Sequence, residues 1–283
     1  MEKKQKGLGV GTRRAIAYIV LIFTVIMCLF WFYVLVINAT RSNGELTKGF
    51  SPIPSTHLLE NWKNLLAGTL PVWSGLINSA VVAGLSAVLC TYFSTMTAYA
   101  IHAYDFKGKN AMFTFILMVM MIPTQVTALG FVQLVTNLKL EESFVPLVVP
   151  TIAAPVTFYY LKQYMSSNLP LSLVEAARID GSGEFHTFNT IVLPLMKPAI
   201  AVQMIFTFVQ SWNNYFIPAL ILHADKKKTL PILIAQLRAA DFLKFDMGQV
   251  YMMIVFSILP VVIVYLFLSR SIVGGVAAGG VKG

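Results

Sequence analysis

The sequence predicts an all-α, polytopic membrane protein with six transmembrane helices and one short cytoplasmic helix between the fourth and the fifth. Three observations support this fold class. Hydrophobic residues make up 57% of the 283 residues and charged residues only 12%, whereas an ordinary soluble domain is about 25% charged. The apolar residues are concentrated in six uncharged stretches, and the densest polar pattern lies between the fourth and fifth of them. Lipid is therefore the expected solvent for most of the chain.

The six stretches have about the length of a membrane-spanning helix, which needs roughly 20 predominantly apolar residues. They cover residues 15–37, 76–101, 112–135, 144–161, 199–222 and 249–269, and none contains Asp, Glu, Lys, Arg or His. The first is too long for the apolar core of a signal peptide, about 7–15 residues, so we expect a retained helix. Together the stretches predict a single six-helix transmembrane domain over residues 15–283.

Positive charge sets the expected orientation, because cytoplasmic loops are enriched in Lys and Arg. The N-terminal tail, residues 1–14, carries five basic residues ahead of the first span and is assigned to the cytoplasm. An even number of spans places the C-terminal tail, residues 270–283, and the loop 162–198 on the same side. Three lysines at 226–228 oppose this assignment, and the chain has 12 basic residues inside against 9 outside. The N-terminal cluster receives more weight because the first helix usually sets the topology.

Several kinds of chemistry lack the residues that they need. The chain has no G-x-x-x-x-G-K-[ST] loop for nucleotide phosphates and no H-E-x-x-H motif, and its four histidines are scattered. Cys28 and Cys90 lie in apolar runs, which indicates small buried hydrophobes rather than a disulfide or a metal site. The net charge of +9 indicates basic cytoplasmic segments rather than a nucleic-acid partner. We therefore expect no catalytic residue, metal or cofactor in this chain, and uncharged spans also disfavour a proton-coupled carrier.

The polar pattern between the fourth and fifth spans predicts a helix–turn–helix on the cytoplasmic face. Ser172 and Glu175 have the S-x-x-E spacing of a capping box, which predicts a short helix over about 172–179. Gly181 lies where a helix-ending residue with positive φ is favoured. A second short helix is expected to follow, with Pro194 preceding the fifth span.

The first of these helices has the chemistry of a docking element. Ala176 and Ala177 have very small side chains, so a partner can approach the backbone closely. Glu175, Arg178 and Asp180 surround them with groups that form charged hydrogen bonds. By local chemistry alone, a surface helix with an ordinary charge pattern is an equally good interpretation.

The spacing of seven residues resembles a family motif, E-A-A followed at fixed intervals by G, I, L and P. The matching residues are Glu175, Ala176, Ala177, Gly181, Ile191, Leu193 and Pro194. The motif is typical of permease subunits of binding-protein-dependent ABC importers, in which this loop forms a coupling helix that sits in a cleft of the ATPase subunit. The resemblance implies an ATPase contact made by Glu175, Ala176, Ala177, Arg178, Asp180 and Gly181.

Further features resemble the smaller membrane subunit of the maltose-type sugar permeases. These are the six spans, the run SWNNYF at 211–216 and the ending GGVAAGGVKG from Gly274. The resemblance implies a heterodimer with a second permease subunit, an ATPase dimer that binds ATP and magnesium, and an extracytoplasmic sugar-binding protein. It implies the bacterial cytoplasmic membrane, with both termini in the cytoplasm. The expected substrate is a sugar or oligosaccharide. A polyol or sugar phosphate is the alternative, and a membrane enzyme or secondary carrier is much less favoured.

Polar side chains in the spans are candidates for the translocation pathway. Four residues of the fifth span follow the spacing i, i+4, i+7, i+11 and are expected to share one helical face. They are Gln203, Thr207, Gln210 and Asn214. Asn213 lies beside them, and Gln125 near Pro123 in the third span is a candidate gate residue. Amides suit sugar hydroxyls, but such side chains also join neighbouring helices, and this second interpretation is somewhat favoured.

Overall fold

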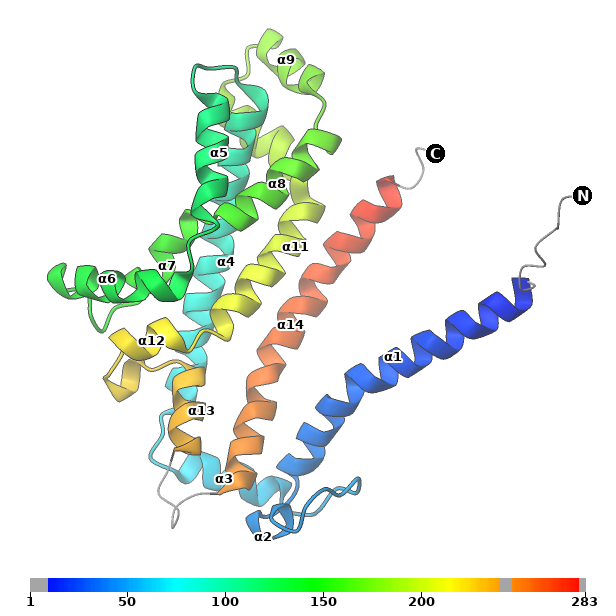
Figure 1. Ribbon diagram of the computed structural model, residues 1–283, viewed down its shortest axis with the longest axis vertical. Helices are drawn as coiled ribbons and strands as arrows, with labels where there is room; N and C mark the ends of the chain where they lie inside the picture. Colours follow the sequence, from blue (N-terminus) through cyan, green and yellow to red (C-terminus); the bar gives the residue numbers. More distant parts are fainter. Residues whose placement is uncertain (1–9, 240–245, 280–283) are drawn as a thin grey trace, which may run out of the picture. The chain divides into compact units, whose positions relative to one another are not determined.

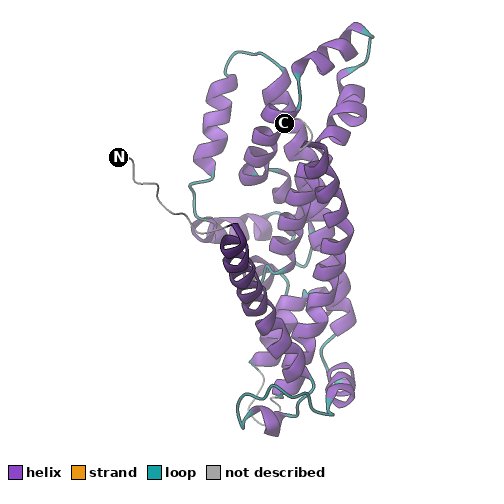
Figure 2. Ribbon diagram, turned by 90° about the vertical axis from the view of Figure 1, so that its right-hand side faces the viewer, coloured by secondary structure: helices purple, strands orange, loops and turns teal. Residues whose placement is uncertain are grey.

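The computed structural model describes residues 10–239 and 246–279, and all regular structure in these residues is helical (Figures 1 and 2). The predicted all-α class is therefore confirmed. The chain divides into two compact units. The first comprises Met1–Thr69 and Leu237–Phe256, and the second comprises Leu70–Gln236 and Ser257–Gly283. Most of the basic N-terminal tail and the last four residues lie outside the described residues.

Five helical segments are long and apolar enough to cross a membrane. They are Val10–Ala39, Val72–Ala103, Val145–Asn168, Glu184–Trp212 and Met247–Ile272. These segments correspond to the first, second, fourth, fifth and sixth predicted spans. The third predicted span has no such helix among the described residues, so the count of six spans stays a prediction.

The third predicted span, residues 112–135, is divided into two helices. The structure has α5, Lys109–Val119, followed by α6, Thr124–Asn137. Pro123 precedes α6 with extended backbone, φ −64° and ψ 129°. Because proline has no N–H to donate to the preceding turn, α5 cannot continue through this position without losing a hydrogen bond. Figure 1 shows α6 lying across the direction of α5.

Proline also divides the fourth predicted span. The segment contains α7 (Val145–Val148), the 3₁₀ turn η1 (Val149–Ile152) and α8 (Pro155–Asn168). Pro155 begins α8, where the missing N–H would have no helical partner in any case. The helix ends at Asn168 rather than at the predicted residue 161.

The fifth predicted span, residues 199–222, is displaced toward the N-terminus. Its helix comprises α10 (Glu184–Thr187), a π-helical turn η2 (Phe188–Val192) and α11 (Leu193–Trp212). Pro194, expected before the span, lies inside this helix directly after the π turn. A short helix α12, Phe216–Ile221, follows separately. Pro218 within it could not donate to the preceding turn of a longer helix, which favours the break after Trp212.

α4, Val72–Ala103, is the central helix of the second unit, with α8 and α11 packed along it. Small buried side chains on α4 allow this close approach: Ala83, Ser86, Ala87 and Ser94. Near the start of α4, Gly75 lies against α13, Leu230–Arg238, so that a Cβ at this position would be 2.5 Å from Leu233 Cδ1. Separate apolar clusters lie toward the two ends of α4, one including Val82 and the other Tyr99.

In the first unit, α1, Val10–Ala39, is apolar and largely exposed, which suits a helix surrounded by lipid. The chain after α1 is held by Arg41, which is only 6% exposed. Its guanidinium donates to the carbonyl oxygens of Glu45 at 2.6 Å and Gly49 at 2.9 Å. These bonds close the loop around α2, Asn43–Leu46.

Asn61 on α3, Leu58–Ala67, ties together the rest of the first unit. Its Nδ2 donates to the carbonyl oxygens of Ala39 and Arg41, both at 2.9 Å. The long helix α14, Met247–Gly279, begins beside it. A Cβ at Gly248 would lie 2.6 Å from Asn61 Oδ1, so only glycine fits this approach.

Candidate functional site

The polar loop between the fourth and fifth spans contains the predicted short helix and glycine turn. α9 covers Leu171–Ile179, one residue more than the predicted 172–179. The predicted capping box is wrong, because Pro170 is the N-cap residue and no side chain caps the helix. Since α9 begins one residue earlier than expected, Ser172 lies inside its first turn. Gly181 has a φ of +76°, as expected for the residue that ends the helix.

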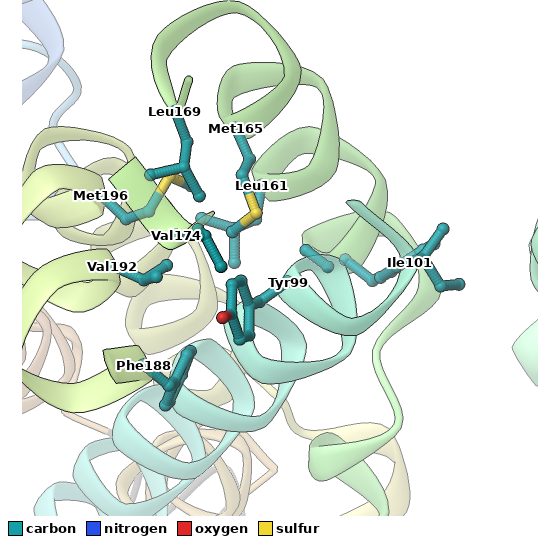
Figure 3. Close-up of a cluster of buried hydrophobic side chains, with 11 residues drawn as sticks. Tyr99, Ile101, Leu161, Met165, Leu169, Val174, Phe188, Val192 and Met196 are labelled. Carbon is teal, nitrogen blue, oxygen red and sulfur yellow. The ribbon is translucent and has the colours of Figure 1, made fainter. Parts of the chain in front are cut away.

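One face of α9 is buried within the second unit. Val174 is 1% exposed and Ala177 is 5% exposed, and their i, i+3 spacing places them on the same side. Val174 belongs to an apolar cluster with residues of α4, α8, η2 and α11 (Figure 3). The labelled members are Tyr99, Ile101, Leu161, Met165, Leu169, Val174, Phe188, Val192 and Met196. Ala177 therefore faces its own chain, and its expected place on an open contact surface is corrected.

The opposite face of α9 and the turn after it are exposed. They carry the other small and acidic residues of the motif: Glu175, Ala176, Asp180 and Gly181. Two large apolar side chains accompany them, since Ile179 is 86% exposed and Phe185 is 69% exposed. Both side chains are left uncovered by the described part of the chain. Ile179 and Phe185 were not identified from the sequence, because the order of apolar residues along the chain does not show which of them the folded core leaves exposed.

Arg178 bonds within the chain and does not simply face outward. Its Nε donates to Oε1 of Glu184 at 2.6 Å, and its guanidinium lies 5.1 Å from the ring centroid of Tyr104. The hydroxyl of Tyr99 donates to Oε2 of Glu184 at 3.1 Å. These four residues, which we name the Arg178 cluster, join α9 to the start of α10 and to the end of α4. Glu184, Tyr99 and Tyr104 were not identified from the sequence.

The electrostatics of the Arg178 cluster keep its groups in fixed protonation states. The hydrogen bond to Glu184 raises the pKa of Arg178. Burial, followed by the hydrogen bond with Glu184, raises the pKa of Tyr104, so the phenol stays neutral. The side chains of Arg178 and Glu184 are 36% and 43% exposed. An ion pair this accessible to water contributes little to stability, and its main consequence is to join α9 to the start of α10.

α9 is attached directly to the long helices of the second unit. The apolar cluster joins α9 to three long helical segments, α4, α8 and α11. His102 Nε2 on α4 also lies 3.0 Å from the carbonyl oxygen of Leu169, directly before α9. α9 and the residue before it are therefore in direct contact with these segments. Within residues 10–239 and 246–279, no three His, Cys, Asp or Glu side chains are grouped as a metal site would require.

Two of the predicted pathway residues lie inside the helix packing. Gln203 and Thr207 on α11 are each 8% exposed. Thr207 Oγ1 lies 3.7 Å from Sγ of Cys90 on α4. These positions fit the interpretation in which polar side chains join neighbouring helices.

The other predicted pathway residues do not share that face. Gln210 is exposed, and α11 ends at Trp212, so Asn213 and Asn214 lie in the turn beyond the helix. The prediction of one helical face for all four polar residues is therefore wrong at its C-terminal end, because the helix does not continue. Gln125 is exposed in the first turn of α6.

Comparison with known proteins shows which family this part of the chain is similar to. Residues 91–273, which include α9 and its turn, match the family described as binding-protein-dependent transport system inner membrane component. The chain is 33% identical to the arabinooligosaccharides transport system permease protein AraQ of Bacillus subtilis (strain 168), over 91% of this chain and 92% of that protein. It is 31% identical to the sn-glycerol-3-phosphate transport system permease protein UgpE of Escherichia coli O1:K1 / APEC, over 92% and 94% respectively.

The fold is also similar to a solved structure. The neighbour is a chain from the crystal structure of a bacterial ABC transporter involved in the import of the acidic polysaccharide alginate. The TM-score is 0.79 over 94% of this chain and 99% of that chain, with 20% sequence identity. At this identity the likeness shows the shared fold alone.

Proposed function

Because the chain belongs to the family of binding-protein-dependent transport system inner membrane components, we propose that it forms, with a second permease subunit, the pathway that carries a sugar or oligosaccharide into a bacterial cell. A separate ATPase dimer binds ATP and magnesium and hydrolyses the nucleotide, while this chain has no catalytic activity. An extracytoplasmic binding protein delivers the sugar. The complex resides in the cytoplasmic membrane, with α9 and both termini on the cytoplasmic side.

The division of α9 into an exposed face and a buried face carries this proposal. The exposed face and the following turn carry the motif residues that would contact the ATPase: Glu175, Ala176, Asp180 and Gly181. The buried face contacts the long helices through Val174. Arg178 holds α9 in position through Glu184 rather than acting only as an ATPase contact. Closure of the ATPase dimer would then move α9 and the helices packed against it together.

The names of the relatives support a carbohydrate or related substrate. AraQ is named for arabinooligosaccharides and UgpE for sn-glycerol-3-phosphate. The chain is 33% identical to the first and 31% identical to the second, so we place a sugar first and a sugar phosphate or polyol second. The candidate substrate contacts remain Gln203, Thr207, Gln210, Asn213, Asn214 and Gln125.

Uptake of a labelled panel of mono- and oligosaccharides, in the source strain with and without this chain, tests the proposed substrate class. Selective loss of uptake of one sugar group is the expected result and would identify the substrate. Unchanged uptake of every sugar, in a strain without a redundant importer, would overturn the carbohydrate assignment. Glycerol phosphate and polyols in the same panel test the second candidate.

Affinity purification of the tagged chain from mild detergent tests the proposed assembly. If the chain is a permease subunit, a second permease subunit and an ATPase are expected to co-purify with it. A secondary carrier or a membrane enzyme would purify without an ATPase. If the purified chain transported substrate actively without any other subunit, that result would contradict the proposal.

A further inference from the structure

The sequence feature that the proposed function leaves unexplained is the run of three lysines. It lies in a short loop, residues 223–229, which joins α12 to α13 and includes the 3₁₀ turn η3, Asp225–Lys227. We name residues 223–229 the lysine loop. It contains three lysines against one aspartate, and its side chains at 223–227 are exposed. The loop therefore presents a concentrated positive charge.

The backbone of the lysine loop is held by an asparagine of α4. Asn78 Nδ2 donates to the carbonyl oxygens of Lys226 and Lys228, both at 2.9 Å. Ser79, the next residue of α4, accepts a hydrogen bond on Oγ from the N–H of Leu230 at 2.8 Å. Asn78 and Ser79 are 9% and 3% exposed, so these anchors are shielded from water.

A carboxylate holds the other end of the loop. Glu142 Oε1 accepts the N–H groups of His223 at 2.6 Å and Ala224 at 3.0 Å. Charge-assisted hydrogen bonds of this kind are stronger than neutral ones. The lysines therefore project from a braced backbone, in contrast to an ordinary flexible surface loop.

The three lysines have different surroundings. Lys228 Nζ lies 2.6 Å from Oδ1 of Asp225, and its side chain is only 11% exposed, so its charge is balanced within the loop. Lys227 Nζ lies 5.2 Å from the ring centroid of Phe144, which orients the ammonium without neutralising it. Lys226 is exposed and has no ion pair within the described part of the chain. Lys226 and Lys227 thus supply two charges that form no ion pair within the described residues, on a backbone that Asn78 holds in place.

The lysine loop and α9 lie at opposite ends of α4. Asn78 and Ser79 belong to the first turns of this 32-residue helix, whereas Tyr99 of the Arg178 cluster belongs to its last turns. A helix of this length extends about 48 Å, enough to cross a bilayer. Figure 1 shows α9 and α13 at the two ends of α4. If α9 contacts an ATPase in the cytoplasm, the lysine loop faces the outside of the cell.

External lysines oppose the general bias toward positive charge on the cytoplasmic side. Their presence therefore calls for a reason other than membrane insertion. We propose that the lysine loop is a docking surface for a carboxylate-rich face of the extracytoplasmic binding protein, with Lys226 and Lys227 as the contacting charges. This inference rests on the proposed function. Complementary charge of this kind accelerates encounter and sets the register of docking.

The test uses the purified importer in liposomes of zwitterionic lipid, with the binding protein of the same system loaded with its sugar. The variant is Lys226→Glu together with Lys227→Glu. We expect the binding-protein concentration that half-stimulates ATP hydrolysis to rise by about tenfold at low salt. The difference should shrink as salt screens the charges. Unstimulated ATP hydrolysis should be unchanged, because α9 and the Arg178 cluster are untouched.

Two further variants serve as controls. Lys139→Glu changes the charge at one lysine outside the lysine loop. Its neighbour Leu140 packs against the same apolar cluster as Ile221, the last residue of α12. This variant should raise the half-stimulating concentration far less. Lys226→Arg with Lys227→Arg keeps both charges and should behave as the unaltered chain. Co-elution of each variant with the other subunits shows that the chain is folded and assembled.

Each outcome separates the inference from the proposed function. An unaltered complex that the binding protein does not stimulate would contradict the proposed function, and the inference with it. Normal stimulation with an unchanged half-stimulating concentration in the double variant would refute the docking surface alone. A defect that occurs only in liposomes containing anionic lipid would assign the loop to lipid headgroups and would also refute it.

Discussion

At the scale of single residues, Glu184 connects segments that are far apart in the sequence. Its two carboxylate oxygens accept hydrogen bonds from Arg178 and from Tyr99, which is 85 positions away. The pair with Arg178 is accessible to water, so its loss should cost little folding free energy. Loss of the Glu184 carboxylate should instead loosen the attachment of α9 to α10 and to α4.

We therefore expect Glu184→Gln to change the thermal midpoint by no more than a loss of about 1 kcal/mol of stability would. The amount of sugar imported per ATP hydrolysed should fall. Both quantities can be measured in proteoliposomes that contain the assembled importer. Asp105→Asn removes an exposed carboxylate just beyond the end of α4 and is the matched control. An unchanged transport stoichiometry in Glu184→Gln would show that the Arg178 cluster has no part in coupling.

Gly181 is the second residue whose role is local and testable. Its φ of +76° is strained for any residue with a Cβ, but there is open space where the Cβ would be. Gly181→Ala should therefore cost about 1–2 kcal/mol through backbone conformation alone, and should weaken association with the ATPase. Gly181→Asn should be milder, because asparagine adopts this conformation more readily.

Gly183 provides the comparison for this prediction. It also has open space around its missing Cβ, but its φ is −68°. Gly183→Ala should therefore leave ATPase association almost unchanged, as measured by co-purification. Equal effects of alanine at 181 and 183 would show that the positive φ is not what the turn requires.

At the scale of elements, the start of α14 packs against α3 with no room for a larger residue. A Cβ at Gly248 would lie 2.6 Å from Asn61 Oδ1 and 2.9 Å from its Cγ. Asn61 cannot move away without losing its hydrogen bonds to Ala39 and Arg41. Gly248→Ala should therefore lower the free energy of unfolding by about 1–3 kcal/mol, the usual cost of overpacking.

Thermal unfolding of the purified protein in detergent would measure this change. Gly44→Ala is the matched control, because no atom lies within 4 Å of the position that its Cβ would take. A stability loss at Gly44 as large as that at Gly248 would contradict the packing explanation.

The loop between α2 and α3 should respond to pH. His57 precedes α3, and its Nδ1 lies 2.7 Å from Glu60 Oε2. The hydrogen bond with Glu60 raises the pKa of His57. Because the folded pKa is the higher one, this stabilisation is present below the ordinary histidine pKa of about 6.5 and is lost as pH rises through the folded pKa.

His57→Gln should accordingly lower the thermal midpoint more at about pH 6 than at about pH 8.5. The lower end of the pH range in which this loop is stabilised depends on the carboxylates. Hydrogen bonding from the backbone N–H of Ser42 lowers the pKa of Glu45, so that contribution is lost only as pH falls through its folded value. In a Glu60→Gln background the His57 substitution should have a smaller effect. An effect of equal size at both pH values would exclude the ion pair as its cause.

At the scale of the whole molecule, we expect the exposed apolar residues beside α9 to affect assembly rather than folding. Ile179 is 86% exposed and therefore contributes little to the stability of this chain. Ile179→Gln should leave the chain folded but should reduce the amount of ATPase that co-purifies with it. Val174, which is 1% exposed on the other face, provides the contrast.

Val174→Ala should cost about 2 kcal/mol, because it removes buried methyl groups and leaves a small cavity. We expect it to lower the thermal midpoint while the exposed face of α9 keeps its contact chemistry. Circular dichroism melting and co-purification together distinguish the two effects. Loss of folding in Ile179→Gln, or loss of ATPase without loss of stability in Val174→Ala, would reverse the assignment of the two faces.

The sequence by itself determined the helical class, because composition and uncharged length decide whether a segment suits lipid. It also determined the position of α9 and of the Gly181 turn, since both depend on neighbouring residues. Only the tertiary structure decided that Ala177 faces inward and that Arg178 pairs with Glu184. These outcomes depend on packing between segments that are distant in the sequence, and a local sequence pattern does not predict which atoms of such segments are in contact.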